Sequence, residues 1–256
     1  MAVNRKNKKS KSSSPAAGRS GSKLPADDLA GIAHAADHDG STGNGEQTLV
    51  DGVYERILLR IIQGKLHSGQ ELKSTILAQE LGVSRTPVVQ ALQRLAADGI
   101  VNLELNKRAV VRPGAENWLV EIHQLRELLE PPAAALAAQN MPDEQLARLR
   151  ELAEAAADRN KAGWSDAVRR FDFALHLAIA DHTGNMALRE AIRKCWSYKR
   201  LSYMAVEDHP DQFAKAYDEH LAIVRALESR DSQTASAAML FHLRSAAVMR
   251  TERRIV

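Results

Sequence analysis

Asp172 and His176 place a carboxylate and an imidazole four residues apart in the otherwise apolar stretch "RFDFALHLAIADHTGN", residues 170–185. Residues four apart on a helix lie on the same face, so both side chains would point at one object. That object is the other side chain, water or a metal ion. A metal ion needs further ligands, so the rest of the chain decides between the three.

Two further histidines lie on apolar stripes of later helical segments. His220 belongs to "YDEHLAIVRALESRD" and His242 to "MLFHLRSAAVM". A single histidine on an apolar face is usually a satisfied core residue, but burying four polar side chains is costly unless one partner satisfies them all. A divalent cation does so with three imidazoles and one carboxylate. Imidazole nitrogen suits zinc or nickel, whereas calcium and magnesium prefer more oxygen ligands.

The composition limits the class of protein. A chain of 256 residues with 45% hydrophobic content is long enough for two domains. The one cysteine, Cys195, excludes an internal disulfide framework and a zinc or iron–sulfur site held by cysteine pairs. No apolar run is long enough to span a membrane, and the N-terminus lacks the apolar core of a signal peptide. We therefore expect a soluble, cytoplasmic protein without membrane partners.

Positive charge is concentrated in the first half of the chain. Residues 1–112 carry a net charge of +5 and the remainder carries −2. This asymmetry is typical of a chain whose first half meets a polyanion. Residues 1–48 are rich in Ser, Gly, Lys and Asp without periodicity, so we expect a disordered tail, either without a role or adding attraction to phosphate.

Residues 49–112 carry the pattern of a winged helix-turn-helix. An apolar stripe predicts a helix from Leu49 that ends at Gly64, and a second helix is expected from about Ser74 to Leu81. Gly82 would stop the second helix and Ser84 would cap a third that Gly99 closes. Two helices joined by a tight turn make a helix-turn-helix. The alternating "IVNLEL" and the later "AVV" predict a two-stranded wing.

The string "LAQELGVSRTPVVQALQRLAADGIV", residues 77–101, resembles the DNA-binding domain of the GntR family of bacterial transcription regulators. The likeness extends over about 60 residues. It implies binding to double-stranded DNA, and the usual match between protein and operator symmetry implies a homodimer on an inverted repeat.

Seven side chains are candidates for DNA contact. Arg85, at the start of the third helix, could bond O6 and N7 of a guanine together. Thr86 and Gln90 could contact base or sugar. Phosphate contacts are expected from Lys73, Arg94, Lys107 and Arg108. The alternative is that several of these side chains only form a solvated basic face.

After "RPG" at 112–114 the pattern is helical to the end, with about six helices and no Gly-rich phosphate loop. The fold class is therefore mainly α, with an all-α domain over residues 115–250. This region is similar to the FCD effector-binding domain of the FadR subfamily of GntR regulators. The resemblance implies that Asp172, His176, His220 and His242 are metal ligands and that the effector is a small organic acid.

Arg126 matches an arginine common in this domain. It could bind the carboxylate of an effector through two hydrogen bonds, or form a salt bridge with Glu130, four residues later, on the helix surface. His123, His182 and His209 match no ligand position, so we expect them at the surface.

These observations favour a metabolite-responsive transcription regulator, a repressor rather than an enzyme. Two alternatives stay open. Three histidines with an open position also resemble a hydrolytic zinc site, and a constitutive DNA binder could hold a purely structural metal.

Overall fold

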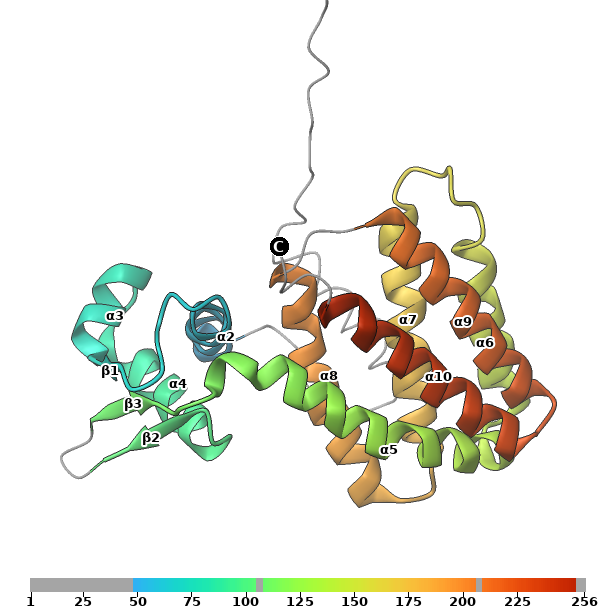
Figure 1. The fold of residues 1–256 in the computed structure, drawn as a ribbon, viewed down its shortest axis with the longest axis horizontal. Helices are drawn as coiled ribbons and strands as arrows, with labels where there is room; N and C mark the ends of the chain where they lie inside the picture. The colour runs from blue at the N-terminus through green and yellow to red at the C-terminus, as the bar shows by residue number, and fades with distance from the viewer. Residues whose placement is uncertain (1–47, 105–107, 206–208, 252–256) are drawn as a thin grey trace, which may run out of the picture.

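The computed structural model describes residues 48–104, 108–205 and 209–251. Most of the tail predicted over residues 1–48, and the candidate phosphate contact Lys107, lie outside these ranges. Figure 1 shows two lobes: a small one that contains all the strands, and a larger one built of helices alone. Within the described ranges, no helix is long and apolar enough to cross a bilayer.

The small lobe is a winged helix-turn-helix. Thr48 caps its first helix, because its side chain accepts a hydrogen bond from the backbone of Asp51 while the Asp51 side chain binds back. Gly82 ends the next helix at φ 67°, a left-handed conformation that glycine adopts without strain. The elements are α2 (Leu49–Ile62), β1 (Glu71–Leu72), α3 (Ser74–Leu81), α4 (Arg85–Ala97), β2 (Val101–Leu103) and β3 (Ala109–Val111).

The wing contains three strands rather than the two predicted. β3 lies in the centre and pairs antiparallel with both neighbours, with Val101 opposite Val111 and Glu71 opposite Val110. Two residues are too short for an alternating pattern, which is why β1 escaped sequence analysis.

The large lobe is a bundle in which α5 packs against α7, α8, α9 and α10. In the described ranges it contains six α-helices, the number expected. Alanines on α5 let the neighbouring helices approach closely, and larger side chains such as Phe171 and Trp196 fill the core. Its elements are η1 (Ala115–Asn117), α5 (Trp118–Asn140), α6 (Asp143–Ala155), α7 (Trp164–Asp181), α8 (Met186–Ala205), α9 (Pro210–Glu228) and α10 (Ser232–Thr251).

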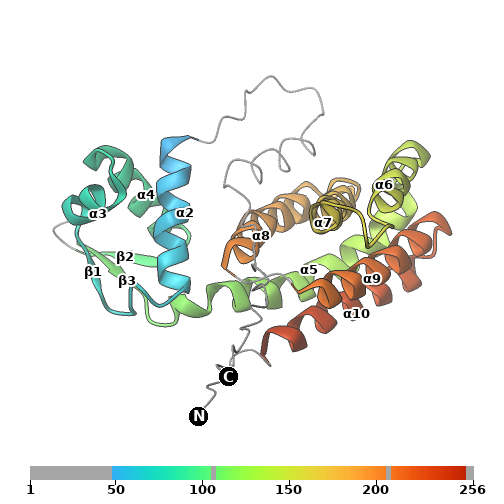
Figure 2. The same ribbon diagram turned by 90° about the horizontal axis from the view of Figure 1, so that it is seen from above.

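The two lobes meet at α8 and at the start of α5, as Figure 2 shows from above. Ile122, Cys195 and Tyr198 belong to the same buried cluster as the core of the small lobe. Asp98, the residue that ends α4, accepts hydrogen bonds from Tyr54 at 2.6 Å and from Lys194 of α8 at 2.6 Å. The residue that caps the C-terminal end of α4 is thus tied directly to the bundle.

Candidate metal centre

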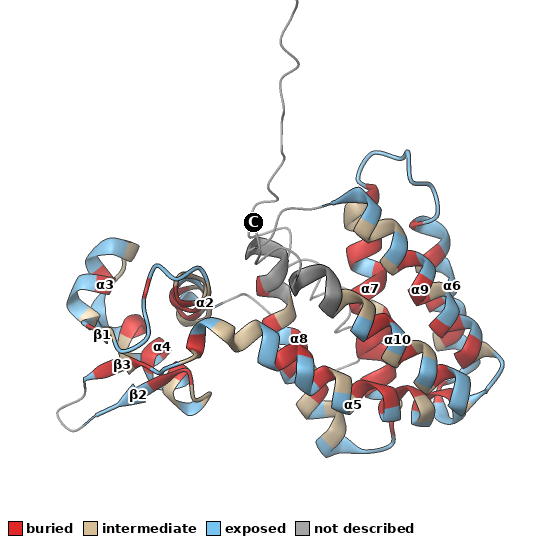
Figure 3. Cartoon of the chain, in the orientation of Figure 1, coloured by how far each residue is buried: buried red, intermediate tan, exposed pale blue. Residues whose placement is uncertain are grey.

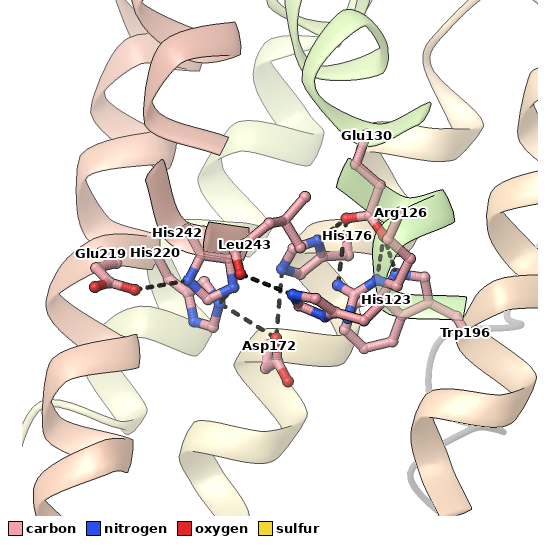
Figure 4. Close-up of polar contacts among 10 residues, drawn as sticks. All are labelled: His123, Arg126, Glu130, Asp172, His176, Trp196, Glu219, His220, His242 and Leu243. Atoms are coloured by element: carbon pink, nitrogen blue, oxygen red, sulfur yellow. Dashed lines mark hydrogen bonds and ion pairs between the residues drawn. The ribbon is translucent and has the colours of Figure 1, made fainter. Parts of the chain in front are cut away.

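The four candidate ligands lie together in the interior of the bundle (Figure 4). Asp172 and His176 come from α7, His220 from α9 and His242 from α10, and all four are buried. One ligand atom from each lies within 4.8 Å of all the others. In Figure 3, buried residues line the sides of these helices that face one another.

The three histidines bring the same ring nitrogen, Nε2, together: those of His176 and His220 face Asp172, and that of His242 faces His220. Oδ1 of Asp172 lies 3.2 Å from Nε2 of His220 and 3.4 Å from Nε2 of His176. The Nε2 atoms of His220 and His242 are 3.1 Å apart. Ligand atoms about 2.0–2.2 Å from a tetrahedral ion lie roughly 3.3–3.6 Å from one another, so the cluster has nearly the size of a zinc site.

Carboxylates hold two of the rings from behind. Nδ1 of His176 lies 2.5 Å from Oε2 of Glu130, and Nδ1 of His242 lies 2.9 Å from Oε2 of Glu219. A carboxylate at Nδ1 favours the tautomer with its proton there, which leaves the lone pair of Nε2 for a metal. The sequence alone indicates no role for Glu219, and for Glu130 only a pairing with Arg126.

The electrostatics of the site favour the protonation states that bind metal. Burial lowers the pKa of His176, and it lowers that of His242 further, so both rings are held neutral. Burial also opposes ionisation of Asp172. The charge of Lys199 and the hydrogen bond with His220 outweigh it and hold the pKa of Asp172 well below its usual range.

A metal ion would satisfy a buried atom of this cluster that otherwise has no hydrogen bond. Nε2 of His176 is shielded from solvent and has no hydrogen-bond partner among the described residues. Leaving a buried polar atom in this state is costly. Because that atom faces the point where the other ligand atoms converge, the residues fit a divalent ion with three nitrogen ligands and one oxygen ligand.

Arg126 lies beside this cluster rather than at the surface. It is 3% exposed, pairs with Glu130 through Nε at 2.5 Å, and places its guanidinium 4.3 Å from the centre of the Trp196 ring. The pairing considered from sequence is therefore present, but it is buried.

The expectation of a surface position was wrong for His123, which is buried because α10 covers its side of α5. Its Nε2 lies 2.8 Å from the carbonyl oxygen of Leu243. His182 is half-buried, with Nδ1 2.8 Å from the carbonyl oxygen of Ala178, and His209 is exposed where α9 begins.

The candidate DNA contacts are arranged around α4. Arg85, Thr86 and Gln90 are exposed on this helix, and Nε of Arg85 donates to Oγ of Ser74 at 2.9 Å. Arg94 differs, because it pairs with Asp51 and lies over the Tyr54 ring of α2. Lys73, immediately before α3, and Arg108, immediately before β3, are both exposed.

Comparison with known proteins agrees with this architecture. The family described as bacterial regulatory proteins, gntR family, matches residues 49–111, and the FCD domain matches residues 121–245. The Nta operon transcriptional regulator of Aminobacter aminovorans is 27% identical over 188 residues, which cover 68% of this chain and 81% of that protein.

A second relative is the probable D-xylose utilization operon transcriptional repressor of Paenarthrobacter nicotinovorans, 28% identical over 199 residues, which cover 77% of this chain and 86% of that protein. The solved structure of E. coli McbR/YncC has a similar fold, with a TM-score of 0.58 and 24% identity over 81% of this chain and 99% of that one. Two domain matches in this order identify the chain as a member of the GntR family of bacterial regulatory proteins that carries an FCD domain behind its winged helix-turn-helix.

Proposed function

We propose that this protein is a cytoplasmic transcription repressor whose binding to an operator is controlled by a small carboxylate metabolite at the metal site of the bundle. The observation that carries the proposal is the convergence of four buried candidate ligands in a chain that also has a winged helix-turn-helix of the gntR family. We assign DNA binding to residues 49–112, and effector binding and dimerisation to residues 115–250.

On the DNA side, a homodimer binds an inverted repeat, with one α4 in each of two successive major grooves. Arg85 reads a guanine, and Thr86 and Gln90 contact neighbouring bases or sugars. Phosphate contacts come from Lys73, Lys107 and Arg108. Arg94 reaches phosphate only if it leaves its ion pair with Asp51.

On the effector side, Asp172, His176, His220 and His242 hold zinc or nickel, which supplies an electrophilic site for a carboxylate. Imidazole binds a metal in its neutral form and Asp172 contributes one negative charge, so a divalent ion keeps a net positive charge in a buried site. Such a site attracts an anion. Arg126, which pairs with Glu130 beside the site, supplies a second positive charge for the effector carboxylate.

The names of relatives support control by a metabolite. One relative is named a repressor of D-xylose utilization, and two from Escherichia coli are named regulators of the Uxu operon and the Exu regulon. An effector can change DNA binding only if it binds one arrangement of the two DNA-binding domains of the dimer more tightly than another. α8 offers the contact for this coupling, because it borders both the metal ligands and Asp98.

The first experiment measures metal content in the purified protein. We expect one zinc or nickel ion per chain in the wild type and in His209→Ala, whose histidine is exposed, and a loss in His220→Ala. Equal content in all three variants would refute the site.

The second experiment identifies the bound DNA by sequencing and titrates the operator complex with sugar acids, hydroxy acids and aromatic acids. A coupling of about 1–3 kcal/mol would weaken operator binding roughly 5–150-fold. If carboxylates bind the metal-loaded protein without changing operator affinity, the metal is structural and effector control is wrong.

A further inference from the structure

Glu130 connects three helices of the bundle through its two carboxylate oxygens. It lies on α5 and is 1% exposed. Its Oε2 faces Nδ1 of His176 on α7 at 2.5 Å, and its Oε1 accepts from Nε1 of Trp196 on α8 at 2.9 Å. Arg126, one turn earlier on α5, donates to both oxygens, at 2.5 and 3.3 Å (Figure 4).

We propose that Glu130 is a positioning residue of the metal centre, which fixes the tautomer and ring position of His176 and joins this ligand to α8 through Trp196. The inference rests on the proposed function, since it assumes that the four ligands hold a metal. It adds a residue, outside the ligand set, on which the affinity of the site depends.

The chemistry of the contacts requires a carboxylate. All three neighbours of Glu130 present N–H groups, and an ionised carboxylate accepts hydrogen bonds at both oxygens. Both oxygens of Glu130 lie against the guanidinium of Arg126, a permanent positive charge that favours the ionised carboxylate in the interior. A glutamine has one acceptor oxygen and would turn its own N–H groups towards a donor.

The other histidines are supported differently. Glu219 binds Nδ1 of His242, but it is 9% exposed and lies 4.0 Å from Nζ of Lys215, one turn earlier on the same helix. Nδ1 of His220 is buried without a hydrogen-bond partner among the described residues. Because Glu130 is more deeply buried than Glu219 and connects three helices, replacing Glu130 should weaken metal binding more than replacing Glu219.

Trp196 shares in the same arrangement. Its ring lies against His176, with centroids 4.6 Å apart and planes tilted by 34°, and its N–H is held by Glu130. Cys195 and Tyr198, close by on α8, pack into the core of the small lobe. A shift of His176 or Glu130 would therefore be transmitted to the helix on which the DNA-binding lobe rests.

The test compares Glu130→Gln, Glu130→Asp and Glu219→Gln with the control Glu127→Gln. Glu127 lies on the same helix but is partly exposed and approaches His123 rather than a ligand. Zinc affinity is measured by competition with a chromogenic chelator, and the visible spectrum of bound Co²⁺ reports the ligand geometry. Partners of metal-ligating histidines typically contribute about 10–100-fold in affinity.

We expect Glu130→Gln to lose about 10–100-fold in zinc affinity and to change the Co²⁺ spectrum, with a smaller loss in Glu219→Gln and none in Glu127→Gln. Wild-type affinity and spectrum in Glu130→Gln would overturn the proposal. If this variant does not fold, Glu130→Asp decides, because it keeps the charge but withdraws the oxygens from His176 by one methylene. Unchanged zinc affinity there would overturn the proposal.

A metal-free measurement separates this inference from the proposed function. Nitrogen NMR of the histidine rings in the metal-free protein should show His176 with its proton on Nδ1 in the wild type and a mixed tautomer in Glu130→Gln. A mixed tautomer in the wild type would refute the role of Glu130 whether or not metal binds. A wild type with the expected tautomer that takes up no zinc or nickel would refute the metal site instead.

Discussion

Removing the hydroxyl of Tyr54 should weaken the small lobe more than removing either contact that α8 makes with the same group of side chains. Asp98 caps the C-terminal end of α4 and accepts hydrogen bonds from Tyr54 and Lys194. The hydroxyl of Tyr198 lies 3.4 Å from that of Tyr54. The variants Tyr54→Phe, Tyr198→Phe and Lys194→Met each remove one member and leave the surrounding packing.

The magnitudes follow from burial and distance. Tyr54 is 6% exposed and donates to an ionised carboxylate at 2.6 Å, a class of hydrogen bond that contributes about 1.5–3 kcal/mol. The Lys194 side chain is 61% exposed, so solvent screening limits its ion pair to about 0–1 kcal/mol. The contact from Tyr198 is long, and its ring keeps the edge-on packing against Trp118 in the phenylalanine variant.

Urea unfolding of the full chain at pH 7, followed by a signal from the small lobe, measures the loss in free energy of unfolding for each of the three variants. Burial raises the pKa of Asp98, but hydrogen bonds from Lys194 and Tyr54 and the charge of Lys194 outweigh burial and lower this pKa. The contribution is therefore present above the unfolded value of about 4 and is lost as the pH falls through the folded pKa. Tyr54→Phe should cost little in an Asp98→Ala background, which offers the hydroxyl no side-chain acceptor. Equal losses for Tyr54→Phe and Lys194→Met would refute the reasoning.

Four further predictions concern other parts of the molecule. Gly82→Ala should lower the free energy of urea unfolding by about 1–2 kcal/mol, because alanine is strained at a φ of +67° even though no atom lies within 4 Å of an added Cβ. An unchanged unfolding midpoint would contradict this. Burial raises the pKa of the Cys195 thiol to about 11, so iodoacetamide at pH 8.5 should label the native protein far more slowly than the urea-unfolded chain; equal rates would contradict burial. Zinc at about 100 times its Kd should add about 2.7 kcal/mol of stability to the wild type and none to His242→Ala, and a rise in Tm in both would place the ion elsewhere. Arg85→Ala should lose about 1–3 kcal/mol on the cognate operator, and unchanged specific affinity would remove this residue from the reading head.

Local patterns were enough to predict most of the elements. A glycine at a helix end and a serine before a helix act within one turn of the chain, so the end of α3 and the start of α4 could be predicted from Gly82 and Ser84. Ser84 occupies the N-cap position of α4, but its side chain makes no capping hydrogen bond. The wing register depends on pairing between strands instead. β1 is only Glu71–Leu72, and it exists because β3 offers it a partner.

The candidate ligands were also predictable from local sequence patterns, whereas the residues that contact these ligands from neighbouring helices were not. Asp172 and His176 are four residues apart, and His220 and His242 stand out as polar residues on apolar stripes. Glu130 reaches His176 over 46 residues and Trp196 over 66 residues of sequence. Such contacts depend on which helices become neighbours.

Arg126 and His123 show where one-dimensional spacing is ambiguous. An Arg and a Glu four residues apart look the same on a solvated helix as in a core, and only the packing of α5 between α7, α8 and α10 decides. The buried side of α5 carries the polar residues His123, Arg126 and Glu130. Its exposed side carries Leu125, Leu128 and Leu136, so the polar residues could not be assigned to a solvent face from periodicity.

A buried Arg126–Glu130 pair is weak evidence for stability, since apolar side chains of similar volume often serve a core as well or better. Removing one partner, by contrast, costs about 3–5 kcal/mol because a buried charge is left unpaired. The presence of this pair is explained by a third residue, His176. Nδ1 of His176 needs an acceptor in the interior, Glu130 supplies it, and Arg126 offsets the cost of burying that carboxylate. If the four candidate ligands hold a metal, as proposed, Arg126 supports that site through Glu130.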